Sequence, residues 1–319
     1  MRPKMVGSVL MPGRYIGRRE SACLYTSRMN AATLLPTHVI VDDLGRWVRE
    51  DGLDEGDITT EVLVEVGEHA SMRLVAREDL VVCGLEPVVR GLEVLGCGLT
   101  LQPTLRDGDT ASVGEALGTL SGDRRAILGL ERTILNLLGR LCGVATCTRR
   151  FVDAIAGTDA VITDTRKTMP GLRLWDKYAV LCGGGISHRT GLHDAALFKD
   201  NHFAGMSPVE MAAALSRAIA AARADRSLAF VEVEVDTLEQ LDAVLPLPGL
   251  DIILLDNMPP EVMREAVARR DDVAPAVKLE ASGGITLDTA RAAAESGVDR
   301  IAVGATTRDA TILDIGLDA

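Results

Sequence analysis

The chain has 319 residues, of which 47% are hydrophobic and 25% are charged, a composition that is ordinary for a globular protein with one large barrel or two modest domains. It carries 34 Lys and Arg residues against 46 Asp and Glu residues, a formal net charge of −12, and only 3% of its residues are aromatic. A surface that binds nucleic acid needs broad positive charge or stacking aromatics, so these numbers argue against a nucleic-acid partner. No apolar run reaches the roughly 18 residues that a membrane span needs, so we also expect no membrane partner and a cytoplasmic location.

The first 28 residues form an unusual segment. Six basic residues face a single acidic residue, Glu20, and neither a hydrophobic period nor the core of a signal peptide is visible. We expect residues 1–28 to be a basic, disordered extension that lies ahead of a true start at Met29. A targeting segment is the alternative interpretation.

Residues 37–120 combine helical and strand-like patterns. LPTHVIVDDLGRWVREDG (35–52) predicts a helix, and HASMRLVAREDLVVCGL (69–85) predicts two strands. TLRDGDTASVGEALGTL (104–120) predicts a strand, an Asp-Gly turn and a second strand. This α+β unit carries no evident catalytic constellation of its own.

A long amphipathic segment follows at residues 124–157, RRAILGLERTILNLLGRLCGVATCTRRFVDAIAG. Its apolar residues recur with helical spacing. We expect two helices here, with a break near Gly143.

The second half of the chain alternates apolar strands with helices. Helix starts are marked by a capping box at Ser207 and Glu210 with Pro208 between them, by Thr237 with Gln240, and by Thr286. Strands that alternate with helices require parallel pairing and right-handed crossovers, so a barrel or an open doubly wound sheet is expected. The predicted strands are residues 160–165, 196–201, 228–235, 251–256, 276–282 and 300–305.

Polar or small residues stand at the carboxyl end of each predicted strand. They are Asp164 with Arg166, Lys199, Glu234, Asp256, Ser282 and Gly304. An open sheet would concentrate such residues at one switch point, whereas a barrel places its site around the whole C-terminal mouth. This distribution favours the barrel.

Positive charge is concentrated in one stretch of this acidic chain, DTRKTMPGLRLWDKYAVLCGGGISHRTGLHDAALFKDNH (164–202). A solvated basic face, a nucleic-acid patch and a pocket for a small, strongly anionic ligand are the three competing interpretations. The triple glycine at 183–185 fits either a loop that approaches a ligand closely or a simple turn.

The six cysteines are scattered, and neither a C-x-x-C pair nor a histidine at metal-ligand spacing accompanies them. We therefore expect reduced thiols and no disulfide framework or zinc site. They are Cys23, Cys83, Cys97, Cys142, Cys147 and Cys182.

From about Asp57 onward the chain resembles quinolinate phosphoribosyltransferase, also called nicotinate-nucleotide pyrophosphorylase (carboxylating). The resemblance rests on ERTILNLLGRLCGVAT, the whole 164–202 stretch, VEVEVDTLEQLDAVL, ILLDNM, LEASGGI and VGATTRDATILDIGLD, in that order. D-T-R-K-T, G-G-G-x-x-H-R and K-D-N-H are the most specific blocks when they occur together.

The resemblance implies an α/β chain with an N-terminal α+β sandwich domain (29–142) and an incomplete (β/α) TIM-like barrel (143–305) of the type II phosphoribosyltransferases, with residues 306–319 packing on the first domain. It also implies a homodimer with shared active sites, or a larger assembly. The implied reaction joins quinolinate to 5-phosphoribosyl-1-pyrophosphate with Mg²⁺ and releases pyrophosphate and CO₂, giving nicotinate mononucleotide for NAD biosynthesis.

Such ligands explain the basic stretch, because two adjacent carboxylates and a pyrophosphate require local cations, and the guanidinium fork suits carboxylates. The matched positions place Arg166, His188 and Arg189 around quinolinate, with Arg132 reaching in from a neighbouring subunit. For Arg132 taken alone, a surface charge on a helix is the simpler interpretation, and for His188 a structural histidine is the alternative. Lys167 and Lys199 are expected to meet carboxylate or diphosphate charge.

The carboxylates have the opposite expected task. Glu234 and Asp256 are predicted to hold Mg²⁺, directly or through water, and to stabilise the positive charge that develops on the ribose. Glu232 shares the pattern, but the match favours Glu234, and an outward-facing charge is the alternative for either residue. The phosphate is expected at backbone N–H groups of Ser282, Gly283, Gly284, Gly304 and Ala305, helped by a helix N-terminus.

Several residues differ from those that the family commonly has at the matching positions. Arg308-Asp309 stands where the family commonly has His-Ser, Ser187 replaces an Asn, Cys142 replaces a Ser, and Leu80 replaces a Gly. These departures leave open a paralogous phosphoribosyltransferase that acts on another pyridine or aromatic acid. A non-catalytic ligand-binding dimer and a Schiff-base aldolase that uses Lys199 are further alternatives, which the retained cluster of charged residues disfavours.

Overall fold

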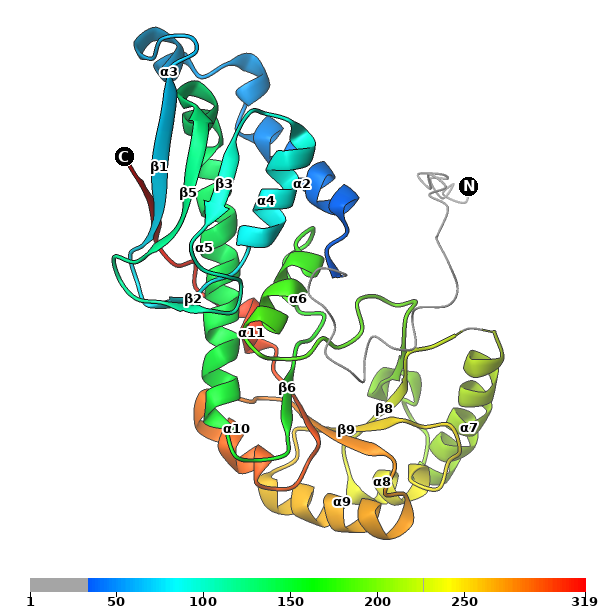
Figure 1. The fold of residues 1–319 in the computed structure, drawn as a ribbon. Helices are drawn as coiled ribbons and strands as arrows, with labels where there is room; N and C mark the ends of the chain where they lie inside the picture. The colour runs from blue at the N-terminus through cyan, green and yellow to red at the C-terminus, as the bar shows by residue number, and fades with distance from the viewer. Residues whose placement is uncertain (1–33, 226) are drawn as a thin grey trace, which may run out of the picture.

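The computed structural model describes residues 34–225 and 227–319, and Figure 1 shows two parts that share one long helix. The predicted basic extension, 1–28, and residues 29–33 lie outside the described residues. No helix within the described ranges combines the length and apolarity needed to cross a membrane.

The first part is built around an antiparallel sheet with the strand order β12-β1-β5-β3. Its central strand β1 turns alternate residues inward at its start, as expected for a sheet with one solvated face. The sheet contains β1 (His69–Ala76), β3 (Thr100–Pro103), β5 (Ala116–Asp123) and β12 (Ile315–Asp318), and a separate pair joins β2 (Leu80–Val81) to β4 (Thr110–Ala111).

Helices α2 (Thr37–Glu50) and α4 (Leu85–Leu95) pack against each other beside this sheet (Figure 1). The predicted helix at 35–52 and the two strands at 69–85 are confirmed. The third strand was predicted too late in the sequence, because β3 ends at Pro103 and residues 105–109 form the turn around Gly108, whose φ is 96°. A short helix, α3 (Ile58–Leu63), begins at Asp57, whose side chain accepts the Thr59 and Thr60 N–H groups.

The long helix α5 (Arg124–Ala154) is continuous over 31 residues, so the predicted break near Gly143 is wrong. The glycines serve close packing instead. A Cβ atom on Gly143 would lie 1.9 Å from the Thr311 carbonyl oxygen, and one on Gly139 would lie 2.6 Å from that of Leu313. The expected domain boundary at 142 and 143 therefore falls inside a helix that contributes to both hydrophobic cores.

The second part contains a parallel sheet with the order β6-β11-β10-β9-β8-β7. The order closes a barrel except between β6 and β7, and all six predicted strands are confirmed. One isolated bridge, between Thr163 and Ile186, lies beside β6 at the open side. The strands are β6 (Val161–Thr163), β7 (Ala196–Phe198), β8 (Val231–Val235), β9 (Ile252–Asp256), β10 (Lys278–Ser282) and β11 (Arg300–Ala302).

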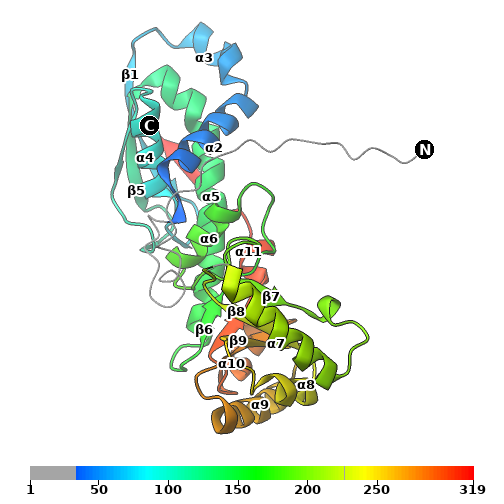
Figure 2. The same cartoon turned by 90° about the vertical axis from the view of Figure 1, so that its right-hand side faces the viewer.

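Helices surround the outside of this incomplete barrel, as Figures 1 and 2 show. The predicted caps are present: Glu210 accepts the Ser207 N–H at 2.9 Å, and Thr237 accepts the Gln240 N–H at 3.3 Å. Thr286 forms a capping box with Thr289. The helices around the barrel are α7 (Pro208–Asp225), α8 (Leu238–Val244), α9 (Pro260–Val273) and α10 (Leu287–Ala294). Helix α6 (Arg173–Cys182) packs against α5, the short α11 (Ala305–Arg308) follows β11, and a 3₁₀ turn η3 (Asp200–His202) follows β7.

The triple glycine forms a tight turn after α6. A Cβ atom on Gly183 would lie 2.5 Å from the Ala145 carbonyl oxygen, and one on Gly185 would lie 2.8 Å from Val180 Cγ1. Gly184 has φ 92°, a conformation that favours glycine. The packing against α5 supports the turn interpretation.

Candidate active site

The carboxyl ends of the parallel strands bring most of the predicted residues to one edge of the barrel. Ser282 at the end of β10 pairs in register with Asp256 at the end of β9. Glu234 lies near the end of β8 beside β9, and Lys199 follows β7. Arg166 and Lys167 follow β6, and Gly304 follows β11. The barrel topology thus assembles these residues at its mouth.

Two arginines at this mouth lack a carboxylate partner among the described residues. Arg189 is only 8% exposed, and burial together with the positive charge of Arg166 lowers the pKa of its guanidinium. Arg189 donates from Nη1 to the Ala195 carbonyl oxygen at 3.3 Å. The buried Nε of Arg166 has no hydrogen-bond partner among the described residues. An anion with two acceptor groups would offset the positive charge of the two guanidinium groups and accept a hydrogen bond from Arg166 Nε.

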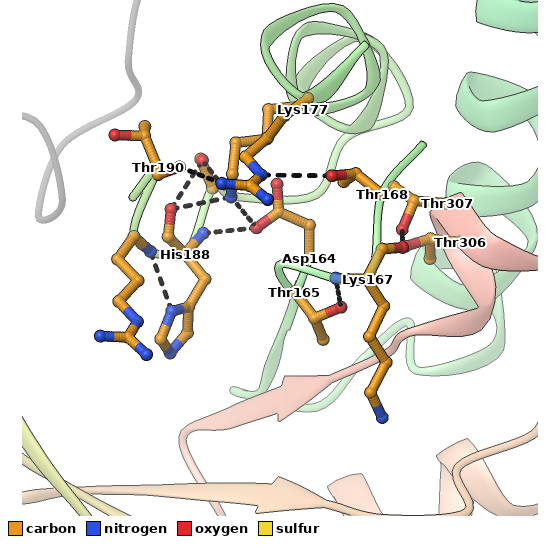
Figure 3. Close-up of polar contacts among 12 residues, drawn as sticks. Asp164, Thr165, Lys167, Thr168, Lys177, His188, Thr190, Thr306 and Thr307 are labelled. Carbon is orange, nitrogen blue, oxygen red and sulfur yellow. Dashed lines mark hydrogen bonds and ion pairs between the residues drawn. The ribbon is translucent and has the colours of Figure 1, made fainter. Parts of the chain in front are cut away.

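Lys167 is directed to a different part of the mouth. In Figure 3 its side chain extends away from Asp164 and His188. A Cβ atom on Gly304 would lie 3.1 Å from Lys167 Cδ, so the glycine leaves room for the lysine to pass. Its backbone is fixed on both sides, because Lys167 N–H donates to Thr165 Oγ1 at 3.0 Å and Thr307 Oγ1 donates to Lys167 O at 2.9 Å.

Two other cations of the 164–202 stretch form hydrogen bonds to groups of the protein itself. Lys177 is fully buried and donates from Nζ to Asp164 Oδ1 at 2.6 Å and to the His188 carbonyl oxygen at 3.0 Å (Figure 3). Burial raises the pKa of Asp164, and Lys177 opposes that rise. Arg173 donates to Thr168 Oγ1 at 3.2 Å. The expectation that the whole stretch lines a ligand pocket is therefore wrong for Lys177, and for the half-buried Arg173 it stays a prediction.

Sequence reasoning did not identify the role of Lys177. The only signal was its position in RLWDKYAVLC, where it follows Trp175 and precedes Tyr178 on a helix whose buried face it shares. Ser187, one of the departures, belongs to the same network, since its Oγ donates to the His188 carbonyl oxygen at 2.9 Å.

His188 lies at the top of a buried ionic layer inside the barrel. Its Nε2 is 2.8 Å from Glu232 Oε2 and 3.4 Å from Glu280 Oε1, and Arg300 donates from Nε to Glu280 Oε2 at 2.6 Å. Glu232 and Glu280 are fully buried. The outward-facing interpretation of Glu232 is wrong, because Glu232 faces the barrel interior, one strand period below Glu234.

The protonation of the His188 ring is decided by two opposing influences. Burial lowers its pKa, but the carboxylates of Glu232 and Glu280 more than offset this, so the net shift of the pKa is upward. The Arg189 N–H opposes a second proton, because it donates to His188 Nδ1 at 2.8 Å and a backbone N–H can only donate. Nε2 is the ring nitrogen that faces Glu232.

The three side chains of His188, Glu232 and Glu280 offer ligand atoms within 4.8 Å of one another. Arg300 already supplies positive charge to Glu280 at this depth, which opposes the binding of a metal ion. The more suitable carboxylates for a cation are at the mouth. Burial and the carboxylates of Glu234 and Asp236 raise the pKa of Asp256, the condition that a divalent cation would relieve.

Lys199 supplies positive charge to one of these carboxylates. Its Nζ bonds to Glu234 Oε2, and the Glu234 side chain is only 8% exposed. Asn257 donates from Nδ2 to Asp256 Oδ2 at 2.6 Å and has a positive φ of 52°. The mouth therefore presents acidic oxygens on β8 and β9 with one lysine beside them.

Two glycine-containing loops complete the mouth. A Cβ atom on Gly283 would lie 2.2 Å from Asn257 Oδ1, so that position requires glycine, whereas the space beside Gly284 is open to 4 Å. Helix α11, which begins at Ala305, has only four residues. A helix N-terminus thus lies at the predicted position after β11, and its contribution to phosphate binding stays a prediction.

Arg132 does not join the other residues within this chain. It lies on α5 with its side chain 64% exposed, 3.8 Å from Glu131, next to a cavity of 340 Å³. That cavity is lined by residues of α2, α5 and Leu172, among them Trp47, Asn136 and Arg140.

Known proteins resemble this chain over most of its length. The family model for the quinolinate phosphoribosyl transferase N-terminal domain matches residues 57–142, and that for the C-terminal domain matches 144–318. The nicotinate-nucleotide pyrophosphorylase [carboxylating] of Mycobacterium leprae is 46% identical over 279 residues, 87% of this chain and 96% of that protein. A probable enzyme of the same name from Bacillus subtilis is 36% identical over 89% of this chain and 92% of that protein. The nicotinate-nucleotide pyrophosphorylase structure from Francisella tularensis superposes with a TM-score of 0.78 at 34% identity, covering 89% of this chain and 96% of that one.

Proposed function

The chain belongs to the quinolinate phosphoribosyltransferase family, and from that premise we propose that it transfers the phosphoribosyl group of 5-phosphoribosyl-1-pyrophosphate to quinolinate with loss of CO₂. The products are nicotinate mononucleotide, pyrophosphate and CO₂, so the reaction serves NAD biosynthesis. The observation that carries the substrate assignment is that two arginines at the mouth of the barrel lack a carboxylate partner: the buried Nε of Arg166 has no hydrogen-bond partner among the described residues, and Arg189 is only 8% exposed.

Two neighbouring guanidinium groups repel each other unless an anion lies between them. Quinolinate carries two adjacent carboxylates, and each can accept a bidentate pair of hydrogen bonds from one guanidinium. Each charge-assisted contact contributes about 1.5–3 kcal/mol net. We propose that Arg166 and Arg189 bind these carboxylates and so orient the ring nitrogen toward the ribose carbon.

The phosphorylated end of the donor is assigned to the opposite part of the mouth. Lys167 passes Gly304, and the loop at Gly283 and Gly284 leaves open space beside its backbone. We propose that the backbone N–H groups of Ser282, Gly283, Gly284, Gly304 and Ala305 bind the 5-phosphate together with the Lys167 ammonium. Support comes from the glycines, which let a phosphate approach the main chain closely.

Glu234 and Asp256 are proposed to hold Mg²⁺, directly or through water. When bound, the ion would neutralise charge on the pyrophosphate as it leaves. The carboxylates themselves would hydrogen-bond the ribose hydroxyls and stabilise the positive charge that develops on the sugar. Lys199, which bonds to Glu234, is placed to compensate the same carboxylate or to meet the diphosphate.

The bond changes require little further from the protein. The ring nitrogen forms a bond to the anomeric carbon while the bond from that carbon to pyrophosphate breaks. The ribosylated nitrogen is then cationic and accepts the electron pair that the departing carboxylate leaves on the adjacent carbon, which takes up a proton. Orientation and exclusion of water are the contributions of the site to this step.

We further propose a homodimer whose active sites are shared between subunits. Arg132 is exposed and lies beside the cavity between α2 and α5. An apolar patch on and after α3, composed of Ile58, Val62, Leu63 and Val66, has side chains between 79% and 84% exposed. Exposed patches of this kind mark protein–protein contacts, and a second copy would both cover it and supply Arg132 to a neighbouring mouth.

A substrate panel tests the function. Purified protein with Mg²⁺ and the ribosyl donor should release pyrophosphate when quinolinate is added and not when nicotinate is added, because nicotinate lacks the second carboxylate. Equal turnover of nicotinate would contradict the proposed dianion site. Turnover of another pyridine or aromatic acid in preference to quinolinate would indicate the paralogous activity, and release with no acid would indicate a different reaction.

A further inference from the structure

Asn257 follows β9 directly and has a backbone conformation that few residues adopt. Its φ is 52°, and among the non-glycine residues that the structure describes it alone has a positive φ. Gly, Asn and Asp tolerate this left-handed conformation at the lowest cost. The residue is exposed, so packing in a hydrophobic core does not explain why Asn stands here.

The orientation of the Asn257 amide is set by Asp256. Asn257 Nδ2 donates to Asp256 Oδ2 at 2.6 Å. An ionised carboxylate can only accept, so the amide nitrogen must face it and the amide oxygen must face away. A glycine would tolerate the same φ but would lack the donor, and an aspartate would place a second carboxylate beside the first. Asparagine meets both requirements.

The other side of the amide lies against the glycine loop after β10. A Cβ atom on Gly283 would lie 2.2 Å from Asn257 Oδ1 and 2.5 Å from Asn257 Cγ. The main chains are joined as well, since the Asn257 N–H donates to the Ser282 carbonyl oxygen at 2.9 Å. One side chain therefore contacts both the carboxylate that is proposed to hold the cation and the loop that is proposed to bind the phosphate.

We propose that Asn257 is a positioning residue that fixes the Asp256 carboxylate relative to the main chain of Gly283, so that one molecule of the ribosyl donor can meet both groups. This inference rests on the proposed function, because that function supplies the donor that spans the two groups. Quinolinate is assigned to Arg166 and Arg189, which Asn257 does not position. Its binding should therefore not depend on Asn257.

A matched pair of substitutions separates the amide from the backbone conformation. Asn257→Gly removes the amide and keeps the φ, whereas Asn257→Ala removes the amide and also strains the backbone. We expect the dissociation constant of the ribosyl donor with Mg²⁺, measured by calorimetry, to rise about tenfold in both variants, because the hydrogen bond that holds Asp256 is lost. The dissociation constant of quinolinate should change less than about twofold, and the melting temperature should fall more in Asn257→Ala than in Asn257→Gly.

Two outcomes of this experiment would overturn the proposal. Wild-type affinity for the donor in Asn257→Gly would show that the position requires only a left-handed backbone. An equal rise in the dissociation constants of donor and quinolinate would indicate a general distortion of the mouth. If the wild-type protein bound the donor but failed to turn over quinolinate, the proposed function would fail while the donor measurement still decided the role of Asn257.

A measurement without any ligand tests the connection itself. In protein whose glycines are labelled with nitrogen-15, the NMR resonance of the Gly283 N–H, assigned by its absence in Gly283→Ala, reports on the loop. Asp256→Asn should shift this resonance in the wild-type background and leave it in place in the Asn257→Gly background, because the connecting amide is gone. The same shift in both backgrounds, or no shift in either, would overturn the proposal. If the wild-type protein bound neither substrate, the proposed function would fail, and this measurement would still decide whether Asn257 connects the two groups.

Discussion

The mouth of the barrel and the interior behind it both contain lysine and arginine side chains, but these side chains differ in their burial and in their carboxylate partners. At the mouth, burial and then the positive charge of Arg166 lower the pKa of Arg189. In the interior, Lys177 bonds to Asp164 and Arg300 bonds to Glu280. Burial of the cation together with a carboxylate partner, more than charge or position in the sequence, distinguishes a structural cation from one available to a ligand; Lys199, which bonds to Glu234, is itself 44% exposed.

The largest effect that this comparison predicts is on stability. Lys177→Met should lower the free energy of unfolding by about 3–5 kcal/mol, because it leaves Asp164 buried without its cation. Urea denaturation measures this loss. Lys278→Met is the matched control: Lys278 also bonds to an aspartate, Asp299 at 2.7 Å, but its side chain is 56% exposed, and we expect a loss below about 1 kcal/mol. Similar losses in the two variants would erase the distinction between interior and surface pairs.

The next largest effect should be a loss of catalytic efficiency without a loss of stability. Arg166→Ala should reduce kcat/KM for quinolinate about 100-fold, by raising KM and lowering kcat, because a charge-assisted contact to the acid is lost. The free energy of unfolding should not fall, since the substitution removes a charge that repels Arg189. Steady-state kinetics and urea denaturation on the same preparation make the comparison. An unchanged kcat/KM would remove Arg166 from the site.

A smaller effect is expected from mixing two inactive variants. If Arg132 of one subunit serves the mouth that contains Lys199 of the other, a hybrid of Arg132→Ala and Lys199→Ala subunits has one intact site of two. Random exchange should then restore about one quarter of the wild-type activity, since half of the dimers are hybrids. Absence of recovery in dimers shown to be hybrid would count against subunit sharing.

The smallest effect is predicted for Arg308, which stands where the family commonly has His. The Arg308 and Asp309 side chains bond to each other and are 58% and 51% exposed. Arg308→Ala should therefore change kcat and both KM values by less than about twofold. A tenfold rise in KM for the ribosyl donor alone would place this arginine at the phosphorylated end of the site.

Much of the barrel could be predicted from the sequence because its signals are local. The apolar runs that end in Glu234, Asp256 and Ser282 give strands with their polar residues at one edge, and the Ser207 cap starts its helix as expected. The continuity of α5 could not be predicted, because Gly143, which suggested a break, is required by the close approach of Thr311 and Ile312, far away in the sequence.

The partners of charged residues were also beyond sequence reasoning. Lys167 and Lys177 lie ten positions apart in one basic stretch, yet one reaches the mouth and the other is fully buried against Asp164. Glu232 and Glu234 point to the same side of β8 at different depths, and only the fold decides which of them meets His188. Tertiary contacts set these roles, and no local pattern encodes them.

Strand β12 has a consequence for the order in which the protein is made. Its residues, 315–318, pair with β1, so the first sheet receives this edge strand only after the intervening barrel has left the ribosome. During translation the early domain must therefore wait with an open sheet edge beside β1, a state in which it can pair with other chains. Completion of the barrel then delivers the strand that covers this edge.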